Sequence, residues 1–176
     1  MRKMFSVGLL VLVLSVFFAG GQAVLVPAAV SDVNDVQGEP GIYLELGDIA
    51  GECSDLNHDG WIVVDSMSFG VHVPECGATG QSRRRGSVVV EDLECVKELE
   101  KSSPKIADAV CEGKVFPEVT IEVISGTANP RLVVKYELKN VVLKSYWHYA
   151  ETGEDVGTED VFTMSYEEIK MIYRVR

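Results

Sequence analysis

The fold of this chain is decided by residues 86 to 123, GSVVVEDLECVKELEKSSPKIADAVCEGKVFPEVTIEV. Apolar and polar residues alternate from Ser87 to Glu91, with Val88 and Val90 on one side, and again from Glu118 to Val123. A period of two is typical of strands with one buried face. The stretch therefore predicts a strand, one short helix and a second strand.

The predicted helix has a clear beginning and a clear end. Ser102 and Ser103 supply a serine N-cap, and Pro104 occupies the first helical position. Gly113 stands where a left-handed C-cap residue is usually needed. We therefore expect a helix from Pro104 to Glu112 that covers part of an otherwise strand-rich domain.

Strand patterns continue on both sides of this stretch. Before it, we expect strands over 42–49 and 61–73. After it, we expect a strand from Arg131 with a bulge near 140–142, and a final pair over 161–166 and 168–175. The strand over 61–73 has one apolar face and one polar face. The apolar set is Val63, Met67, Phe69, Val71 and Val73, interrupted by Asp65, and the polar set is Ser66, Ser68, Gly70 and His72.

These segments resemble the haemolysin-coregulated protein (Hcp) family, the ring-forming tube subunits of type VI secretion. Inside the opening stretch the resemblance is carried by Val90–Leu93, Lys101–Pro104 and Gly113–Pro117. Outside it, the matching segments are Tyr43–Glu52, His58–Ile62, Ser66–Val71, Tyr136–Val141 and Phe162–Ile169. The resemblance covers about residues 42 to 175 and implies a mainly β fold: a β-barrel of about seven to nine strands with one short α-helix.

The resemblance also implies a function. Hcp subunits form hexameric rings that stack into a hollow tube, and small effectors can travel in its lumen. Ser66, Ser68 and His72 would then face the lumen. The loop over 74–85, with Arg83, Arg84 and Arg85, would lie at a ring face and meet carboxylates such as those of residues 151–160 on the next ring. The implied partners are further copies of this chain, effector proteins and a secretion spike.

The N-terminus departs from this family. Residues 1–23 have the pattern of a secretory signal peptide: Arg2 and Lys3, an apolar run from Val7 to Ala19, and small residues up to Ala23. We expect a flexible lead-in over 24–41 and the barrel domain over 42–176. The alternative interpretation of residues 1–23 is an N-terminal anchor that is not cleaved. Hcp subunits normally lack a signal peptide, so two further functions stay open: exported rings or filaments independent of type VI secretion, and a soluble module that binds a ligand in its lumen.

The chain is acidic, with a formal charge of −11. Loss of Arg2 and Lys3 with the signal peptide, which holds no acidic residue, changes this to −13. An acidic surface argues against nucleic acid and anionic membrane as partners of the mature form. It also means that self-assembly must place basic side chains opposite acidic ones.

Four cysteines, at positions 53, 76, 95 and 111, suggest disulfides in an exported chain. Three pairings are possible. The family pattern favours Cys53 with Cys76, between two loops at barrel ends, and Cys95 with Cys111, between a strand end and the helix. The alternative is free thiols.

Metal sites and catalysis have weak signals. Residues 55–60, DLNHDG, begin like a calcium loop, but the twelfth position is Ser66 rather than glutamate, and a hairpin turn uses the same residues. Cys53, His58, His72 and Cys76 would make a zinc site only if two loops met. The chain has no GxSxG, HExxH or phosphate-binding glycine loop. We therefore expect no enzymatic activity, cofactor or metal.

Overall fold

The computed structural model describes residues 11–19, 22–27, 38–73, 87–126, 131–150 and 157–174, with the backbone alone for residues 11–27 and 174. Its elements run β1 (Val11–Ala19), β2 (Gln22–Pro27), β3 (Gly41–Glu45), β4 (Ile62–Val64), β5 (Ser66–Ser68), β6 (Val71–His72), β7 (Val89–Val90), β8 (Leu93–Glu98), α1 (Ser103–Glu112), β9 (Val115–Ser125), β10 (Arg131–Ala150), β11 (Thr158–Ser165) and β12 (Glu168–Arg174).

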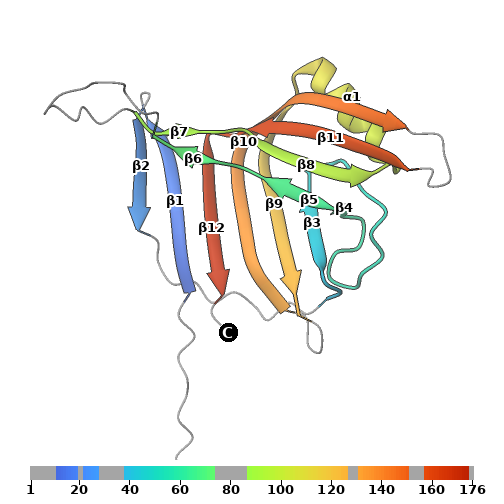
Figure 1. Ribbon diagram of the computed structural model, residues 1–176, viewed down its shortest axis with the longest axis horizontal. Coiled ribbons are helices and arrows are strands. Elements are labelled where there is room, and N and C mark those ends of the chain that lie inside the picture. Colours follow the sequence, from blue (N-terminus) through green and yellow to red (C-terminus); the bar gives the residue numbers. More distant parts are fainter. Residues whose placement is uncertain are drawn as a thin grey trace, which may run out of the picture.

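The long strand β10 connects the two parts of the sheet (Figure 1). Its first half lies between β9 and β12, and its second half pairs with β11. From β11 the pairing continues to β8 and β5, and from β9 it continues to β3 and β4. The circuit is interrupted at Asp65, which separates β4 from β5, so the sheet does not close completely. The predicted mainly β fold with one helix is confirmed, as a nearly closed barrel.

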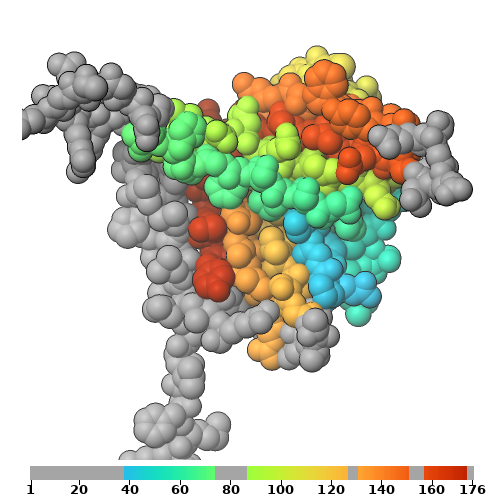
Figure 2. Space-filling view, viewed as in Figure 1, coloured from blue at the N-terminus to red at the C-terminus, as the bar shows by residue number. Residues whose placement is uncertain are grey.

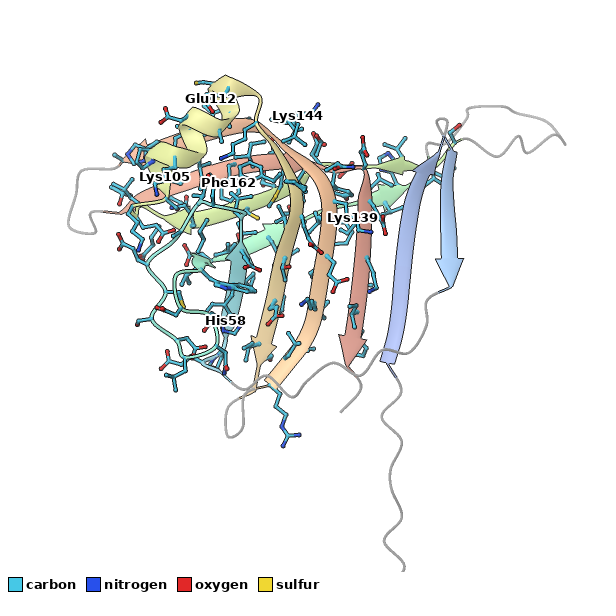
Figure 3. All side chains as sticks on the ribbon, turned by 180° about the vertical axis from the view of Figure 1, so that it is seen from behind. His58, Lys105, Glu112, Lys139, Lys144 and Phe162 are labelled. Carbon is cyan, nitrogen blue, oxygen red and sulfur yellow. The ribbon has the colours of Figure 1, made fainter. Side chains whose placement is uncertain are left out.

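The core lies between the two halves of this curved sheet, below α1. Phe162 contributes from the sheet beneath the helix (Figure 3). The helix adds Ile106 and Ala109 from its buried face. Burial of apolar side chains from every part of the circuit ties the strands together. The largest completely buried apolar side chains are Leu44, Leu46, Ile62, Leu93, Ile106, Phe116, Ile121, Leu138, Phe162 and Met164.

Helix α1 confirms the predicted end and corrects the predicted beginning. Gly113 has φ 63°, ψ 36°, and its backbone N–H donates to the carbonyl oxygens of Ala109 and Val110. The helix starts at Ser103, one residue earlier than expected. No serine hydroxyl bonds to the helix N-terminus: Ser102 Oγ donates to Glu100 Oε1, and Ser103 Oγ points into a buried polar cluster.

The strand expected over 61–73 is three pieces, and its predicted faces are wrong at one end. Ile62 and Val64 are buried while Val63 is 44% exposed, so Val63 does not share a face with Met67. The chain turns at Asp65, where pairing passes from β3 to β8 and the inward parity switches. The strand expected over 42–49 is also shorter, because a turn closed by Leu46 and Ile49 follows β3.

Two other strands exceed expectation. The strand β8 spans six residues and directs Leu93, Cys95 and Lys97 inward. It was not predicted from the sequence as a separate strand. The strand β10 passes through the expected irregularity without ending: Asn140 has φ 49°, and the register against β11 shifts between Leu143 and Ser145.

The N-terminal strands lie outside the barrel circuit. The strand β1 pairs antiparallel with the outer edge of β12, and β2 pairs with β1 (Figure 1). They fall in the segments predicted as signal peptide and lead-in. Among the described residues, no helix is both long and apolar enough to cross a membrane.

Candidate assembly surfaces

One face of the sheet formed by β5, β8, β11 and β10 points away from the core. We call it the outer wall. It follows from strand alternation, because the neighbouring residues Met67, Cys95, Phe162 and Tyr146 point inward. The predicted lumen residues Ser66 and Ser68 both lie on it and are exposed. Three cross-strand rows make up this wall: Ser68–Glu94–Thr163–Ser145, Ser66–Val96–Val161–Trp147 and Glu98–Glu159–Tyr149.

The outer wall combines acidic, hydroxyl and aromatic side chains. Trp147 is 61% exposed and Tyr149 51% exposed, both on the second half of β10. Glu94, Glu98 and Glu159 are exposed beside them. Exposed aromatic rings next to carboxylates offer stacking and hydrogen bonding to a partner, while the acidic side chains keep the surface hydrated.

A two-stranded ribbon, β6 with β7, extends from the wall. Figure 2 shows residues 62–73 crossing the face of the molecule above β9, β10 and β12. His72 is exposed, and its Nδ1 lies 3.5 Å from Glu91 Oε1. The ribbon leads to residues 74–86, so Arg83, Arg84 and Arg85 lie outside the described residues. Four valines in and next to the ribbon are at least 38% exposed: Val71, Val73, Val88 and Val89.

A buried ion-pair cluster holds the wall to α1. Lys97 and Asp160 are both completely buried, and Lys97 Nζ lies 3.2 Å from Asp160 Oδ2. Lys97 Nζ also donates to Ser103 Oγ at 2.9 Å and to the carbonyl oxygen of Glu98 at 2.8 Å. Ser103 Oγ donates to Asp160 Oδ2, and Tyr146 and His148 reach Asp160 Oδ1. Asp160 is thus buried, and of the carboxylates over 151–160 that were expected to meet the next ring it is not available for that contact.

The electrostatics of this cluster favour the charged carboxylate. Burial alone would raise the pKa of Asp160, but hydrogen bonds from Ser103, His148, Tyr146 and Lys97 outweigh it, so its pKa is lowered. Burial, together with the hydrogen bond to Asp160, raises the pKa of Tyr146 to about 12. The inward alternation of Leu93, Cys95 and Lys97 was the sequence signal for a buried lysine.

A second polar cluster fixes the loop between β3 and β4. His58 is buried and stacks on Tyr43, with ring centroids 4.1 Å apart. Its Nδ1 lies 2.8 Å from Asp55 Oδ2, and its Nε2 lies 3.1 Å from Glu122 Oε2. The hydrogen bond from His58 lowers the pKa of Asp55.

These contacts bear on both metal-site alternatives. Both ring nitrogens of His58 are occupied by carboxylates, and Asp55 Oδ2 also accepts the backbone N–H of Asn57. The loop is built as a hydrogen-bonded turn. In the part of the chain that the structure describes, no group of three His, Cys, Asp or Glu side chains is placed to hold a metal ion. Cys76, the fourth zinc candidate, lies outside it.

The cysteines differ from the favoured pairing. Cys95, Cys111 and Cys53 are free thiols. Cys95 points into the core, which raises the pKa of its thiol, while Cys111 is exposed on α1. The structure does not pair Cys95 with Cys111: the Cys95 thiol is enclosed in the core, whereas the Cys111 thiol faces solvent. The other predicted pair involves Cys76 and cannot be placed.

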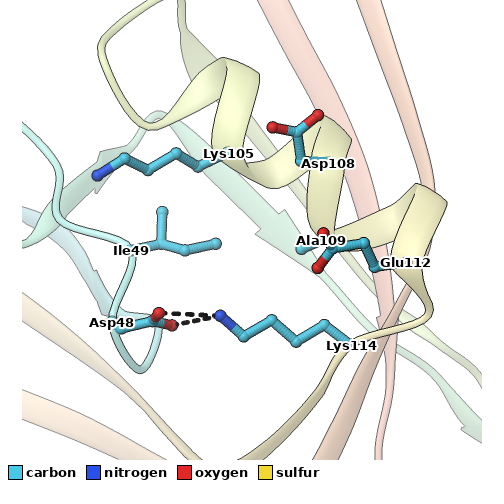
Figure 4. A pocket seen from close by; sticks show the side chains of 7 residues that line it. All are labelled: Asp48, Ile49, Lys105, Asp108, Ala109, Glu112 and Lys114. Carbon is cyan, nitrogen blue, oxygen red and sulfur yellow. Dashed lines mark hydrogen bonds and ion pairs between the residues drawn. The ribbon is translucent and has the colours of Figure 1, made fainter.

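A shallow pocket beside α1 was not predicted (Figure 4). Lys114 Nζ bonds both carboxylate oxygens of Asp48, at 2.7 and 2.9 Å, which lowers the pKa of Asp48. Lys105, Asp108 and Glu112 line the helix side. Charges of both signs, with one lysine already paired to Asp48, suit a hydrated charged surface better than a ligand site.

The comparisons with known proteins agree with this geometry. A family model described as "Type VI secretion system effector, Hcp" matches residues 43–173. The Hcp1 protein of Pseudomonas aeruginosa is 28% identical over 134 residues, covering 76% of this chain and 82% of that protein.

Solved structures share the fold. A structure titled as a type six secretion system protein has a TM-score of 0.69 at 22% identity, covering 78% of this chain and 84% of its own. Hcp1 from Salmonella typhimurium has a TM-score of 0.64 at 18% identity, covering 80% and 88%.

Proposed function

The chain belongs to the Hcp family of type VI secretion, and from this premise we propose that it is a non-enzymatic subunit that assembles with copies of itself into a ring. The ring is hexameric, as the family resemblance implies, and rings stack into a hollow tube. The family membership rests on the match over residues 43–173.

The observation that carries the proposal is the uncovered outer wall. A sheet packed on the core by one face leaves its other face to water or to a partner. Here that face presents Trp147 and Tyr149 at more than half exposure, beside the serines at 66 and 68. In a ring, the wall around Ser66, Ser68 and His72 lines the lumen and contacts small effectors.

In the proposed tube, stacking of rings uses the loop over residues 74–85. Arg83, Arg84 and Arg85 pair with carboxylates of the neighbouring ring, where bidentate guanidinium contacts are strongest. Glu159 is exposed and available for this role, whereas Asp160 is not. Such pairs offset the repulsion between acidic subunits.

Negative-stain microscopy of the purified mature protein, which begins after Ala23, tests both levels of assembly. Wild type should show rings and stacked rings. Changing Arg83, Arg84 and Arg85 together to Glu should leave single rings, because the stacking contacts become repulsive. A control with the same charge change, Lys101, Lys105 and Lys144 to Glu, should still stack. Stacks in the arginine variant would refute the stacking role, and the absence of rings from wild type would refute the function.

A second candidate is favoured by residues 1–23. Their signal-peptide pattern fits an exported Hcp-like protein that forms rings or filaments outside the cytoplasm, without a type VI apparatus. Mass spectrometry of protein from the medium or periplasm of expressing cells that lack the apparatus tests this. A chain beginning after Ala23 supports export through the general route. Intact residues 1–23 on a cytoplasmic chain reject it.

A third candidate is a soluble module that binds a ligand in its lumen. The mass of the particle in solution distinguishes it from the two assembling candidates. Light scattering on the mature protein should give the mass of a ring. A lone monomer at high protein concentration would favour the binding module.

A further inference from the structure

The outer edge of β12 is occupied by a strand that does not belong to the barrel. Seven residue pairs join β1 to β12, from Val11 opposite Arg174 to Phe17 opposite Glu168. On its other side β12 pairs with β10. Removal of β1 would leave a whole row of β12 backbone N–H and C=O groups without partners. Such an edge readily accepts another strand.

A second edge in the same molecule has a matching length. Residues 66–72 pair on one side with β8 and β7, from Ser66 opposite Val96 to His72 opposite Val89. Their other side has no strand partner among the described residues. This edge spans seven residues, as β12 does. In the described sheet, the strands run in the order β12, β10, β11, β8 and β5 once β1 and β2 are set aside. The outer edge of β12 and the free edge of β5 are therefore the two ends of this row of strands.

The side chains of the two edges are also compatible. On β12, Ile169 lies in the core and Met171 follows it on the same face. On the other edge, Met67 and Phe69 pack against the core, and Phe69 meets Tyr136 with ring centroids 5.7 Å apart. Antiparallel pairing of these edges between two copies would continue one apolar face and one polar face across the junction.

We propose that β1 covers an assembly edge: residues 66–72 of a second copy bind the outer edge of β12, and β1 must leave first. This inference rests on the proposed ring function and names its contact. The contact joins two different edges, so it repeats head to tail and can close a ring. Exchange of β1 for the incoming strand replaces one set of backbone hydrogen bonds by another.

The signal-peptide pattern of the sequence offers a way to remove β1. A cut after Ala23, as the signal-peptide pattern predicts, deletes all of β1 and the first residues of β2. The uncut chain is thereby held as a monomer until residues 1–23 are lost. Because the signal peptide is removed during export, each chain would become able to assemble only after it has been exported.

A reversible lock on β1 tests the proposal in the full chain. Ser15 stands opposite Lys170. Opposed residues in antiparallel strands have Cα atoms about 4.5–5.5 Å apart, within the range of a disulfide. The variant carries Ser15→Cys and Lys170→Cys, a specific protease site after Ala23, and replacements of the four native cysteines, with Val at buried Cys95. After cutting, the disulfide still holds β1 in place.

Light scattering should then give one chain mass for the cut, oxidised protein and a several-fold larger mass after a reductant is added. The control carries Lys170→Cys without Ser15→Cys and should assemble on cutting alone. Rings formed while β1 is locked would overturn the inference but leave the proposed function standing. Failure of both proteins to assemble in any state would reject the proposed function and the inference together.

A second measurement identifies the edge. A photoreactive residue at Ser68 should link to residues 168–174 of another copy in assembled protein, as mapped by mass spectrometry. Links only to other segments would show that residues 66–72 bind elsewhere and would overturn the pairing.

Discussion

At the scale of single residues, Lys97 and Asp160 decide how the helix and the outer wall are joined. The pair is removed completely from water, so its charges are compensated by each other and by the surrounding protein groups: hydroxyls, the Glu98 carbonyl oxygen and the His148 ring. Among the described residues no buried side-chain nitrogen or oxygen lacks a hydrogen-bond partner. A fully satisfied polar cluster of this kind specifies one arrangement of the elements it joins.

Lys97→Met should therefore destabilise the fold strongly, by about 3–5 kcal/mol, because it leaves the buried Asp160 carboxylate without its lysine partner. Adding Asp160→Asn should recover part of the loss. Urea unfolding followed by circular dichroism measures both. Lys139→Met removes a pair with Glu168 in which the lysine side chain is 54% exposed, and it should cost only about 1 kcal/mol. Equal effects at positions 97 and 139 would contradict the importance of burial.

Asp55 should contribute to acid sensitivity. Its pKa is lowered in the folded state by the hydrogen bond from His58. The stabilisation is therefore complete above the unfolded pKa, about 3.9, and is lost as the pH falls through the lower folded value. Asp55→Asn should lose less stability than wild type on going from about pH 4 downward. Asp59→Asn, an exposed change in the same loop, serves as the control, and an identical acid response in all three proteins would disprove the role of Asp55.

At the scale of elements, α1 and the ribbon show two kinds of dependence on neighbours. The end of α1 is local, because Gly113 alone supplies the left-handed residue. The beginning is not local, because the hydroxyl expected to cap it is drawn into the Lys97 cluster. The two strands of the ribbon pair with each other, while Val71 and Val89 stay exposed, so the apolar side chains of the ribbon lack a packed environment.

Gly113→Ala should cost about 1 kcal/mol or slightly more, since a Cβ in the left-handed region is strained while the surroundings leave it space. Gly157→Ala is the matched control: its Cβ also meets open space, without a positive φ, so stability should stay the same or rise slightly. Chemical denaturation compares them. A neutral Gly113 variant would argue against the left-handed cap.

The ribbon valines should matter to assembly more than to folding. Val71→Thr with Val89→Thr keeps the β-branched shape and removes apolar surface that is 52% and 39% exposed. The unfolding midpoint of the monomer should change little, while the protein concentration needed for rings should rise several-fold. Val115→Thr, equally exposed on β9, provides the comparison. Loss of stability without loss of assembly would reverse this interpretation.

At the scale of the whole molecule, net charge and sheet edges act against each other. In the proposed assembly, the acidic surface opposes contact between copies, while open sheet edges and exposed aromatic rings favour it. Backbone pairing between edges is short-ranged and nearly independent of salt. Contacts between guanidinium and carboxylate groups on the surface are screened by salt.

Added salt should therefore shorten stacks before it disrupts rings. The screening length falls from about 10 Å at 0.1 M to about 3 Å at 1 M salt. Analytical ultracentrifugation across this range should show large particles giving way to single rings. Growth of the stacks with salt would mean that apolar contacts, rather than ion pairs, hold them together.

Much of the fold was predictable because its signals are local. Alternation located β10, β11 and β12, and Pro104 with Gly113 located the helix. The errors lie where long-range contacts override local pattern. Asp65 turns because its neighbours pair with different strands, and Asp160 is buried because Lys97 is brought beside it. Ser66, Ser68 and His72 lie on an exposed face, but their place in a lumen stays a prediction.

By itself, the sequence determined the family, the mainly β fold, the helix and its glycine end, and the acidic charge. These depend on residue type, order and spacing, which short stretches of chain already contain. Only the tertiary structure decided that Lys97 and Asp160 form a buried pair, that His58 is enclosed by two carboxylates, and that β1 lies on the edge of β12. Each of these joins residues distant in sequence, and no local pattern records which distant groups the folded backbone will bring together.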